Sequence, residues 1–219
     1  MDGERRGRMA RDAVDGYVSG PDAPRVAAAA ALADAASARS VVLVEGISDQ
    51  IALETLAELR GRDLASEDVV VIPIGGAHAV ARHLVRFGPQ GAGLRVSGMC
   101  DAGEEELFRL GLAAAGLGAP RTRIEMEQLG FFVCVEDLED ELIRASDRAS
   151  IEALLEAQGD LTSFRSLQKQ PPWRHRSFEA QMLRFLGGAR RKLRYSRVLV
   201  RSLYPDRVPR PLEEVLGHA

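Results

Sequence analysis

Four short apolar runs, each ending at a glycine or an acidic residue, constrain the fold of this 219-residue chain more than any other feature. The runs span residues 40–45, 69–74, 94–100 and 130–135, and the helical patterns between them span residues 48–60, 77–86 and 104–115. Near-continuous apolar strands that alternate with helices are typical of a parallel sheet covered on both faces. The sequence therefore predicts an α/β domain with a four-stranded parallel sheet flanked by helices.

Carboxylates stand where two of these runs end. Glu45 ends the first run, and Asp101 directly follows the third. Ligands in open α/β sheets collect outside the carboxyl ends of the strands, so we expect both side chains at one crevice rather than in the core. Mg²⁺ takes carboxylate oxygens and keeps several waters, and facing acids from separate elements suit it. This spacing predicts a divalent-cation site at the strand ends.

The chain is expected to divide into three parts. Residues 1–38 are predicted to be a charged leader followed by a helix, residues 39–146 the sheet domain, and residues 147–219 a helical, arginine-rich appendage. Ser48 is the expected N-cap of the first helix of the sheet domain. After the last strand the pattern predicts helices over residues 137–145, 149–158, 178–187 and 189–203, with a polar loop around Pro171 and Pro172.

Charge is distributed unevenly along the chain. The formal net charge is −3, yet residues 1–159 carry −11 and residues 160–219 carry +8. A basic segment beside an acidic site suits a polyanionic partner, because the segment can hold phosphates while metal ions neutralise the acids. The equally weighted alternative is an arginine-rich helix that docks on the acidic part.

The composition excludes several classes of protein. The two cysteines, Cys100 and Cys134, are too few for a disulfide framework or a zinc cluster, and their apolar surroundings predict buried thiols. No apolar stretch reaches the length of a membrane span, and the N-terminal residues lack the apolar core of a signal peptide. We therefore expect a cytoplasmic protein without membrane contact.

The four runs together resemble a known family. The segments VVLVEGISD, VVVIPIGGAHAV, VSGMCDAGEE and GFFVCVEDLEDEL are similar to the TOPRIM domain of topoisomerases, bacterial primases and OLD nucleases, and the OLD-like branch fits best. The likeness covers residues 40–145 and implies a Rossmann-like sheet. It implies that Glu45 is a general acid or base or a metal ligand and that Asp101 holds Mg²⁺. It also implies that Asp49 shares the metal.

Two acidic motifs need separate treatment. The family's Asp-x-Asp pair is Asp-Ala-Gly at residues 101–103 here, so the second aspartate is missing, and Glu104 or Glu105 could replace it. For the later cluster, the resemblance implies that Glu136 and Glu139 hold a second ion. The alternative is that acids at a helix start complement the helix dipole.

The basic part offers candidates for contact with substrate. The predicted nucleic-acid contacts are Trp173, Arg174, Arg176, Arg190 and Arg191. Trp173 could stack on a base, although a single tryptophan in such a loop more often anchors the loop. OLD-like enzymes carry a functional lysine after the acidic strands, and Lys169, one of two lysines, is the predicted catalytic one. A surface role is the alternative for Lys169.

Absent motifs narrow the chemistry further. No Gly-Lys dipeptide occurs, so the ATP-binding P-loop of full-length OLD proteins is missing. We therefore expect an Mg²⁺- or Mn²⁺-dependent nuclease that uses two ions to hydrolyse phosphodiester bonds of DNA, with RNA also open as substrate. The alternative is a weakened TOPRIM module that binds nucleic acid or a separately encoded ATPase and regulates it. Phosphotransfer on a small substrate is a third class, which leaves the basic tail unexplained.

Overall fold

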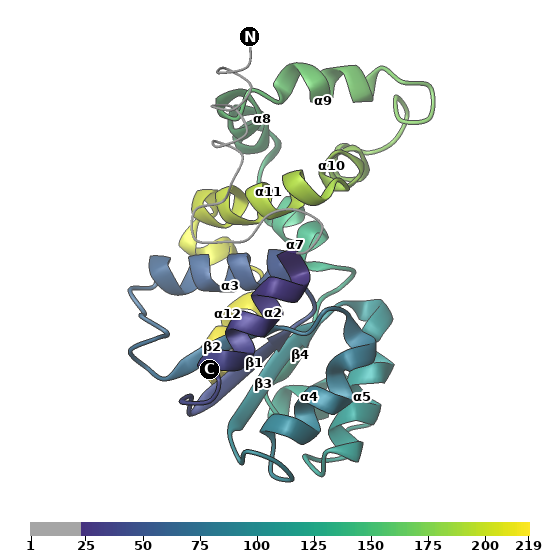
Figure 1. Cartoon of the computed structure of the whole chain (residues 1–219). Helices are drawn as coiled ribbons and strands as arrows, with labels where there is room; N and C mark the ends of the chain where they lie inside the picture. The colour runs from purple at the N-terminus through teal and green to yellow at the C-terminus, as the bar shows by residue number, and fades with distance from the viewer. Residues whose placement is uncertain (1–22) are drawn as a thin grey trace.

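The protein is built on a four-stranded sheet (Figure 1). The structure is a computed structural model that describes residues 23–219. For residues 23, 24, 189 and 190 it describes the backbone alone. The strands are β1 (Ser40–Val44), β2 (Val69–Pro73), β3 (Arg95–Cys100) and β4 (Phe131–Val133). Their order is β2-β1-β3-β4, and all neighbours are parallel. This arrangement confirms the predicted sheet. Strand β4 is shorter than the predicted run 130–135, although the Cys134 amide still donates to the Cys100 carbonyl at 2.9 Å. The Val135 amide, on the open edge of the sheet, donates to the Glu141 carboxylate.

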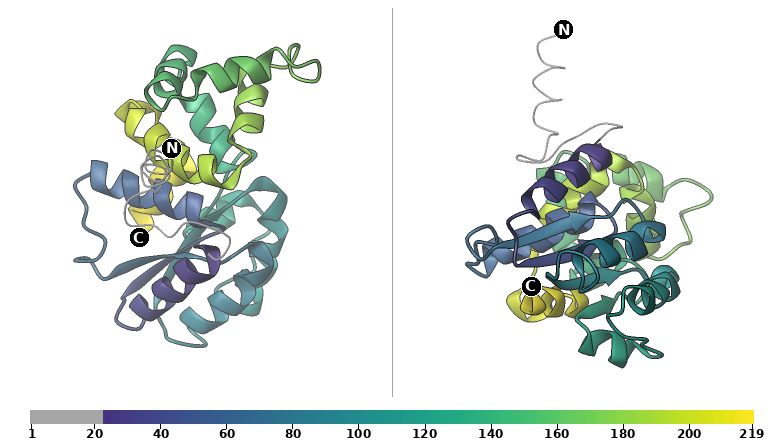
Figure 2. Two further views of the ribbon diagram at one scale, coloured as in Figure 1. Left: turned by 45° about the horizontal axis from the view of Figure 1, so that its top comes forward. Right: turned by 60° about the horizontal axis from the view of Figure 1, so that its bottom comes forward.

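Alternating side chains of each strand enter two separate cores. Val41 and Leu43 belong to one core, whereas Val42 and Val44 belong to the other. All four are fully buried, as expected for a strand covered on both faces. Figures 1 and 2 show helices on both sides of the sheet.

The first face is covered by the helix that precedes β1 and by helices that connect later strands. They are α2 (Ala23–Asp34), α4 (Val80–Phe87), α5 (Glu105–Ala114) and α6 (Arg123–Gln128), and the 3₁₀ turns η1 (Ala77–Ala79) and η2 (Ala102–Glu104) precede α4 and α5. Phe108 and Leu112 of α5, with Met126 of α6, are fully buried against this face. The helix predicted to follow the N-terminal leader is α2, while the leader itself lies outside the described residues.

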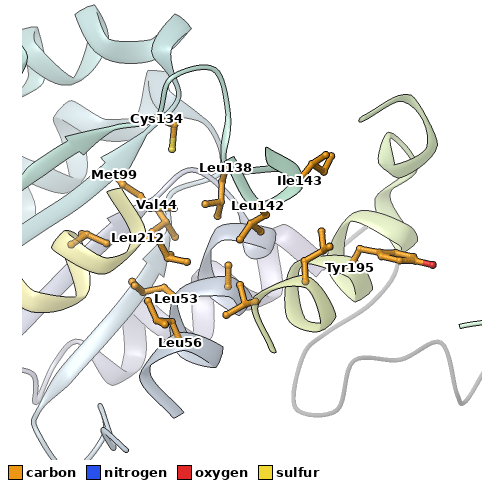
Figure 3. Packing of buried hydrophobic residues seen from close by; sticks show 14 of the residues in the cluster. Val44, Leu53, Leu56, Met99, Cys134, Leu138, Leu142, Ile143, Tyr195 and Leu212 are labelled. Atoms are coloured by element: carbon orange, nitrogen blue, oxygen red, sulfur yellow. The ribbon is translucent and has the colours of Figure 1, made fainter. Parts of the chain in front are cut away.

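The second face is covered by one connecting helix and by helices from the end of the chain. They are α3 (Ile47–Leu59), α7 (Leu138–Ala145), α11 (Ala189–Ser202) and α12 (Arg210–His218). The elements α8 (Arg148–Ala157), α9 (Leu161–Gln168) and α10 (Phe178–Leu186) extend this layer away from the sheet, and η3 (Pro205–Arg207) precedes α12 (Figure 1). Figure 3 shows the apolar packing that runs from Val44 and Met99 of the sheet through Leu138 and Leu142 to Tyr195.

Three local predictions were wrong. Helix α3 begins at Ile47 with Gly46 as its N-cap, so Ser48 is already inside the helix. The segment predicted as a polar loop contains helix α9. Helix α12 was not predicted at all, although Leu212 is fully buried against the sheet (Figure 3). The predicted boundary at residue 147 stays a prediction, but the last helix beyond it packs on β3 and β4.

Ion pairs fasten the last two long helices to the acidic domain. Arg201 of α11 lies 2.7 Å from Glu58, and Arg210 of α12 lies 2.7 Å from Glu127. These contacts support the docking alternative for α11 and α12. Across residues 23–219, none of the helices combines the length and the hydrophobicity needed to cross a bilayer.

Candidate active site

The two strand-end carboxylates meet, as the sequence predicts. Glu45 follows β1 and Asp101 follows β3, and these strands are neighbours in the sheet. The Glu45 Oε1 atom accepts a hydrogen bond from the Asp101 backbone amide at 2.9 Å. The carboxyl ends of parallel strands therefore bring both acids to one edge of the sheet.

Asp49 joins these two acids from the first turn of α3. Its Oδ2 atom accepts a hydrogen bond from the Gly46 amide at 2.8 Å, and the residue is only 8% exposed. This hydrogen bond gives a partner to a backbone amide at the helix start that would otherwise have none. It also fixes the side chain beside the end of β1.

A glycine pair after β2 holds the loop that carries Glu45. Gly75 and Gly76 have φ values of 76° and 105°, a conformation that favours glycine. Both amides lie 3.1 Å from the Glu45 carbonyl oxygen and donate to it. The backbone of Glu45 is thus tied to the neighbouring strand end.

Glu139 and Lys192 complete the cluster. Glu139 lies in the first turn of α7 and is 7% exposed. Its Oε2 atom is 3.1 Å from the Lys192 Nζ atom of α11. Its Oε1 atom is buried and has no hydrogen-bond partner among the described residues. A buried carboxylate oxygen without a partner is costly, which points to a ligand at this position.

The acids raise one another's pKa values. Burial raises the pKa of Asp101 to about 8, with the charge of Glu45 as the next cause. Burial raises the pKa of Asp49 to about 7, followed by the charge of Glu139. Burial also raises the pKa of Glu45. These acids therefore hold protons more tightly than free carboxylic acids do, as expected where buried acidic groups are crowded together.

Lys192 carries the compensating positive charge. Burial alone would lower its pKa, but the charges of Glu139, Asp49 and Asp101 outweigh burial and raise it. The amine is thus held as an ammonium beside the Glu139 carboxylate. Sequence analysis missed Lys192, and the one available signal was that the chain has only two lysines.

The two candidates for the missing aspartate have different surroundings. Glu104 is close enough for its charge to raise the pKa of Glu45. Glu105 instead pairs with Arg123 at 2.8 Å. The structure therefore brings Glu104, but not Glu105, to the cluster.

The later acidic motif is also divided. Glu136 is exposed. Its charge is among the causes that raise the pKa of Arg144, after the hydrogen bond from Arg144 to Asp140. Its neighbour Asp137 caps α7 by accepting from the Asp140 amide at 2.7 Å, and its charge raises the pKa of Asp101. Of the two predicted ligands here, Glu139 lies in the cluster and Glu136 lies outside it.

The predicted basic residues are distributed over two regions. Lys169 lies exposed at the end of α9 and makes no ion pair with the described acids. Arg174 and Arg176 are exposed in the same loop, and Trp173 is half-buried there. Arg191 lies on α11 and reaches Asp160 at 3.9 Å. The side chain of Arg190 lies outside the described part of the chain.

The acids are not arranged as a closed metal cage. Within residues 23–219, no three Asp, Glu, His or Cys side chains converge closely enough to ligate one ion. Glu45 and Asp49 are turned to backbone amides, and Glu139 is turned to Lys192. The donor chemistry nevertheless suits a hard cation, because these donors are carboxylate oxygens.

The parallel sheet and its strand-end acids define the class as a TOPRIM-type α/β domain. Residues 38–101 match the family model of the "Overcoming lysogenization defect protein-like, TOPRIM domain". This segment is therefore similar to the OLD-like TOPRIM domain. No curated protein matches the chain.

Solved structures show the same fold. One is the C-terminal region of the OLD protein of Xanthomonas campestris pv. campestris, with 21% identity and a TM-score of 0.68 over 84% of this chain and 93% of that one. Another is the C-terminal region of the Burkholderia pseudomallei OLD protein, with 20% identity and a TM-score of 0.60 over 83% and 96%. At more than four fifths of the chain, the likeness extends well beyond residues 38–101.

Proposed function

We propose that this protein is a metal-dependent nuclease that hydrolyses phosphodiester bonds of DNA at the carboxylate cluster. The observation that carries the proposal is the buried, unpartnered oxygen of Glu139 beside three acids whose pKa values are all raised. Such a cluster is unfavourable unless cations neutralise it. Mg²⁺ and Mn²⁺ take carboxylate oxygens of this kind.

The residues that would hold the metal come from separate elements. Glu45 and Asp101 come from strand ends, Asp49 from α3 and Glu139 from α7, and Glu104 is the further candidate. We propose that these side chains turn toward the metal when it binds and together hold two ions. When bound, the metal would lower the pKa of a water and neutralise charge on the phosphate.

The protein's own groups have distinct tasks. Lys192 is placed to donate to a phosphate oxygen, and we propose it rather than Lys169 as the lysine that stabilises developing charge. Glu45 can exchange a proton at its carboxylate, because its raised pKa is nearer neutrality than that of a free glutamate. The glycine pair and the Asp101 amide keep Glu45 in place.

A second function is favoured by one observation. Gly103 stands where the family has its second aspartate, and the space beside it is open, since no neighbouring atom lies within 4 Å of the place that a Cβ atom would take. If Glu104 does not replace that aspartate, the domain binds nucleic acid or a partner ATPase and regulates it without cutting. The two functions share the fold and differ in the metal site.

Plasmid cleavage tests the proposal. Wild type, Glu45→Gln and Asp101→Asn would be incubated with supercoiled DNA in Mg²⁺, in Mn²⁺ and in chelator, with an RNA substrate in parallel. Metal-dependent nicking that is lost in both variants supports the nuclease. Glu105→Gln is the matched control, because Glu105 is paired with Arg123 outside the cluster. No cleavage with either metal, together with retained DNA binding, supports the regulatory function instead.

A further inference from the structure

The segment between α9 and α10 is held from inside by one buried side chain. Gln181 of α10 is 6% exposed. Its Nε2 atom donates to the Trp173 carbonyl at 2.9 Å and to the Arg176 carbonyl at 3.2 Å. Its Oε1 atom accepts from the Gln168 Nε2 atom at 2.8 Å. Gln181 thus fixes the middle and the end of the segment and links them to the last residue of α9.

Backbone turns add to this order. The Arg174 amide donates to the Gln170 carbonyl at 3.0 Å, and the Arg176 amide donates to the Trp173 carbonyl at 2.9 Å. Ser177 then caps α10 by accepting from the Ala180 amide at 3.2 Å. The segment is therefore a built part of the fold, which Figure 1 shows projecting beyond α10.

Exposed positive charge is concentrated on this part of the molecule. The cations are Arg165, Lys169, Arg174, Arg176 and Arg184, and we call them the α9–α10 basic surface. None of them forms an ion pair with a residue between positions 23 and 219, and Glu179 is the single acid among residues 161–187. By contrast, Lys192, Arg201 and Arg210 of the following helices all pair with acids.

Trp173 is placed as an anchor of this surface. The ring is half-buried, and the Arg184 guanidinium lies 5.8 Å from its centroid. One face of the ring is therefore occupied by a neighbouring side chain. A base could not use that face for stacking, which favours charge over stacking as the source of binding.

We propose that the α9–α10 basic surface is a preformed grip for the phosphate backbone of duplex DNA, with Gln181 as its positioning residue. The proposal rests on the proposed function only in taking nucleic acid as the substrate. Exposed cations without an ion pair gain the most from phosphates, because binding releases counterions and breaks no internal ion pair. A segment already fixed by hydrogen bonds loses less conformational entropy on binding. Contacts to phosphate carry no sequence information, so the grip is independent of sequence.

The test measures binding without cleavage. Glu45→Gln protein in chelator would be titrated against labelled duplexes of two unrelated sequences at several salt concentrations. Arg174→Gln and Arg176→Gln, added singly, should each weaken binding roughly fivefold near physiological salt and lower the salt slope by about one, equally for both sequences. Arg121→Gln is the matched control, because Arg121 is exposed on the other layer.

A substitution of Gln181 tests the hydrogen bonds that hold the segment. Gln181→Met keeps the charge of the surface and removes all three hydrogen bonds, so it should weaken binding by a similar factor. Its melting temperature is measured alongside, and if this variant unfolds, the two arginine variants decide. Unchanged affinity and slope in both arginine variants would overturn the proposal.

Other outcomes separate the two proposals. Loss of single-strand binding alone in Trp173→Leu, with duplex binding intact in the arginine variants, would replace the phosphate grip by a stacking platform. If the protein nicks plasmid but its DNA binding does not depend on the arginines, the nuclease proposal stands and the proposal of a phosphate grip is wrong. If binding depends on the arginines but no metal-dependent cleavage occurs, the proposal of a phosphate grip stands and the nuclease proposal is wrong.

Discussion

Lys192 and Glu139 face each other at 3.1 Å, although one belongs to the arginine-rich helix α11 and the other to the helix that follows the sheet. The contact lies at the strand ends, where Asp49 and Asp101 also act on the ammonium. The basic part of the chain therefore contributes to the acidic site directly. Helices α11 and α12 use their charges for docking, whereas α9 and α10 keep theirs exposed.

Replacing Lys192 by methionine should lower kcat for DNA cleavage by a factor on the order of 10² to 10³, because a fixed donor for developing phosphate charge is removed. Single-turnover cleavage with saturating enzyme measures this effect. Lys169→Met is the paired variant: it should raise KM and leave kcat unchanged, since Lys169 lies exposed on the α9–α10 basic surface. The reverse pattern would restore Lys169 as the catalytic lysine.

Glu104 and Glu105 should differ although they are adjacent. Glu104→Gln should weaken metal-dependent activity about 10- to 100-fold, because its charge reaches Glu45. Glu105→Gln loses its contact with Arg123 and should leave activity within a factor of about two, since ion pairs near the surface contribute little. A Mg²⁺ titration of cleavage measures both. Equal losses in the two variants would mean that neither acid replaces the missing aspartate specifically.

The sheet could be predicted because its strands are continuous apolar runs, and because Val41 to Val44 are buried on both faces. Helix α12 was hidden by Pro209 and Pro211, which suggest a break in the chain but are compatible with a helix start. Helix α9 was hidden by its polar composition, with Phe164 as its one buried residue.

The candidate site was predictable only in its local part. Glu45 and Asp101 follow strands, so their common edge is a consequence of the parallel sheet. Lys192 has no local signal, because its place beside Glu139 depends on how α11 packs against α3 and α7. The prediction named Glu136 and not Asp137, although the charge of Asp137 is the one that raises the pKa of Asp101. Where a strand ends, a shift of one residue changes which side chain faces the site, and the sequence does not determine that shift.

Leu212→Ala should destabilise the protein by about 2–5 kcal/mol, because Leu212 is fully buried between α12 and the sheet. Urea unfolding followed by circular dichroism measures the change. Leu110→Ala is the control, since Leu110 is 59% exposed on α5 and its loss should change stability by less than about 0.5 kcal/mol. Equal stability of the two variants would show that α12 is not part of the cooperative core.

The carboxylate cluster should make the metal-free protein less stable as pH rises. The folded-state pKa values of Asp49 and Asp101 are about 7 and about 8, whereas an unfolded aspartate titrates near 3.8. Between these values the folded state binds more protons than the unfolded state, so the free energy of unfolding falls with increasing pH. Well below the unfolded pKa and well above the folded ones, these two groups contribute no slope.

Melting curves in chelator between about pH 5 and about pH 9 measure this dependence, because that window brackets both folded-state pKa values. Asp101→Asn separates the contribution of Asp101 from that of other titrating groups. The variant should lose part of the fall in melting temperature, whereas Asp206→Asn, at an exposed position, should not. Mg²⁺ should stabilise wild type more at the alkaline end, because carboxylates must lose their protons to bind it. If wild type and Asp101→Asn had parallel profiles, with Mg²⁺ equally effective at both ends, the acids would not form one coupled metal-binding cluster.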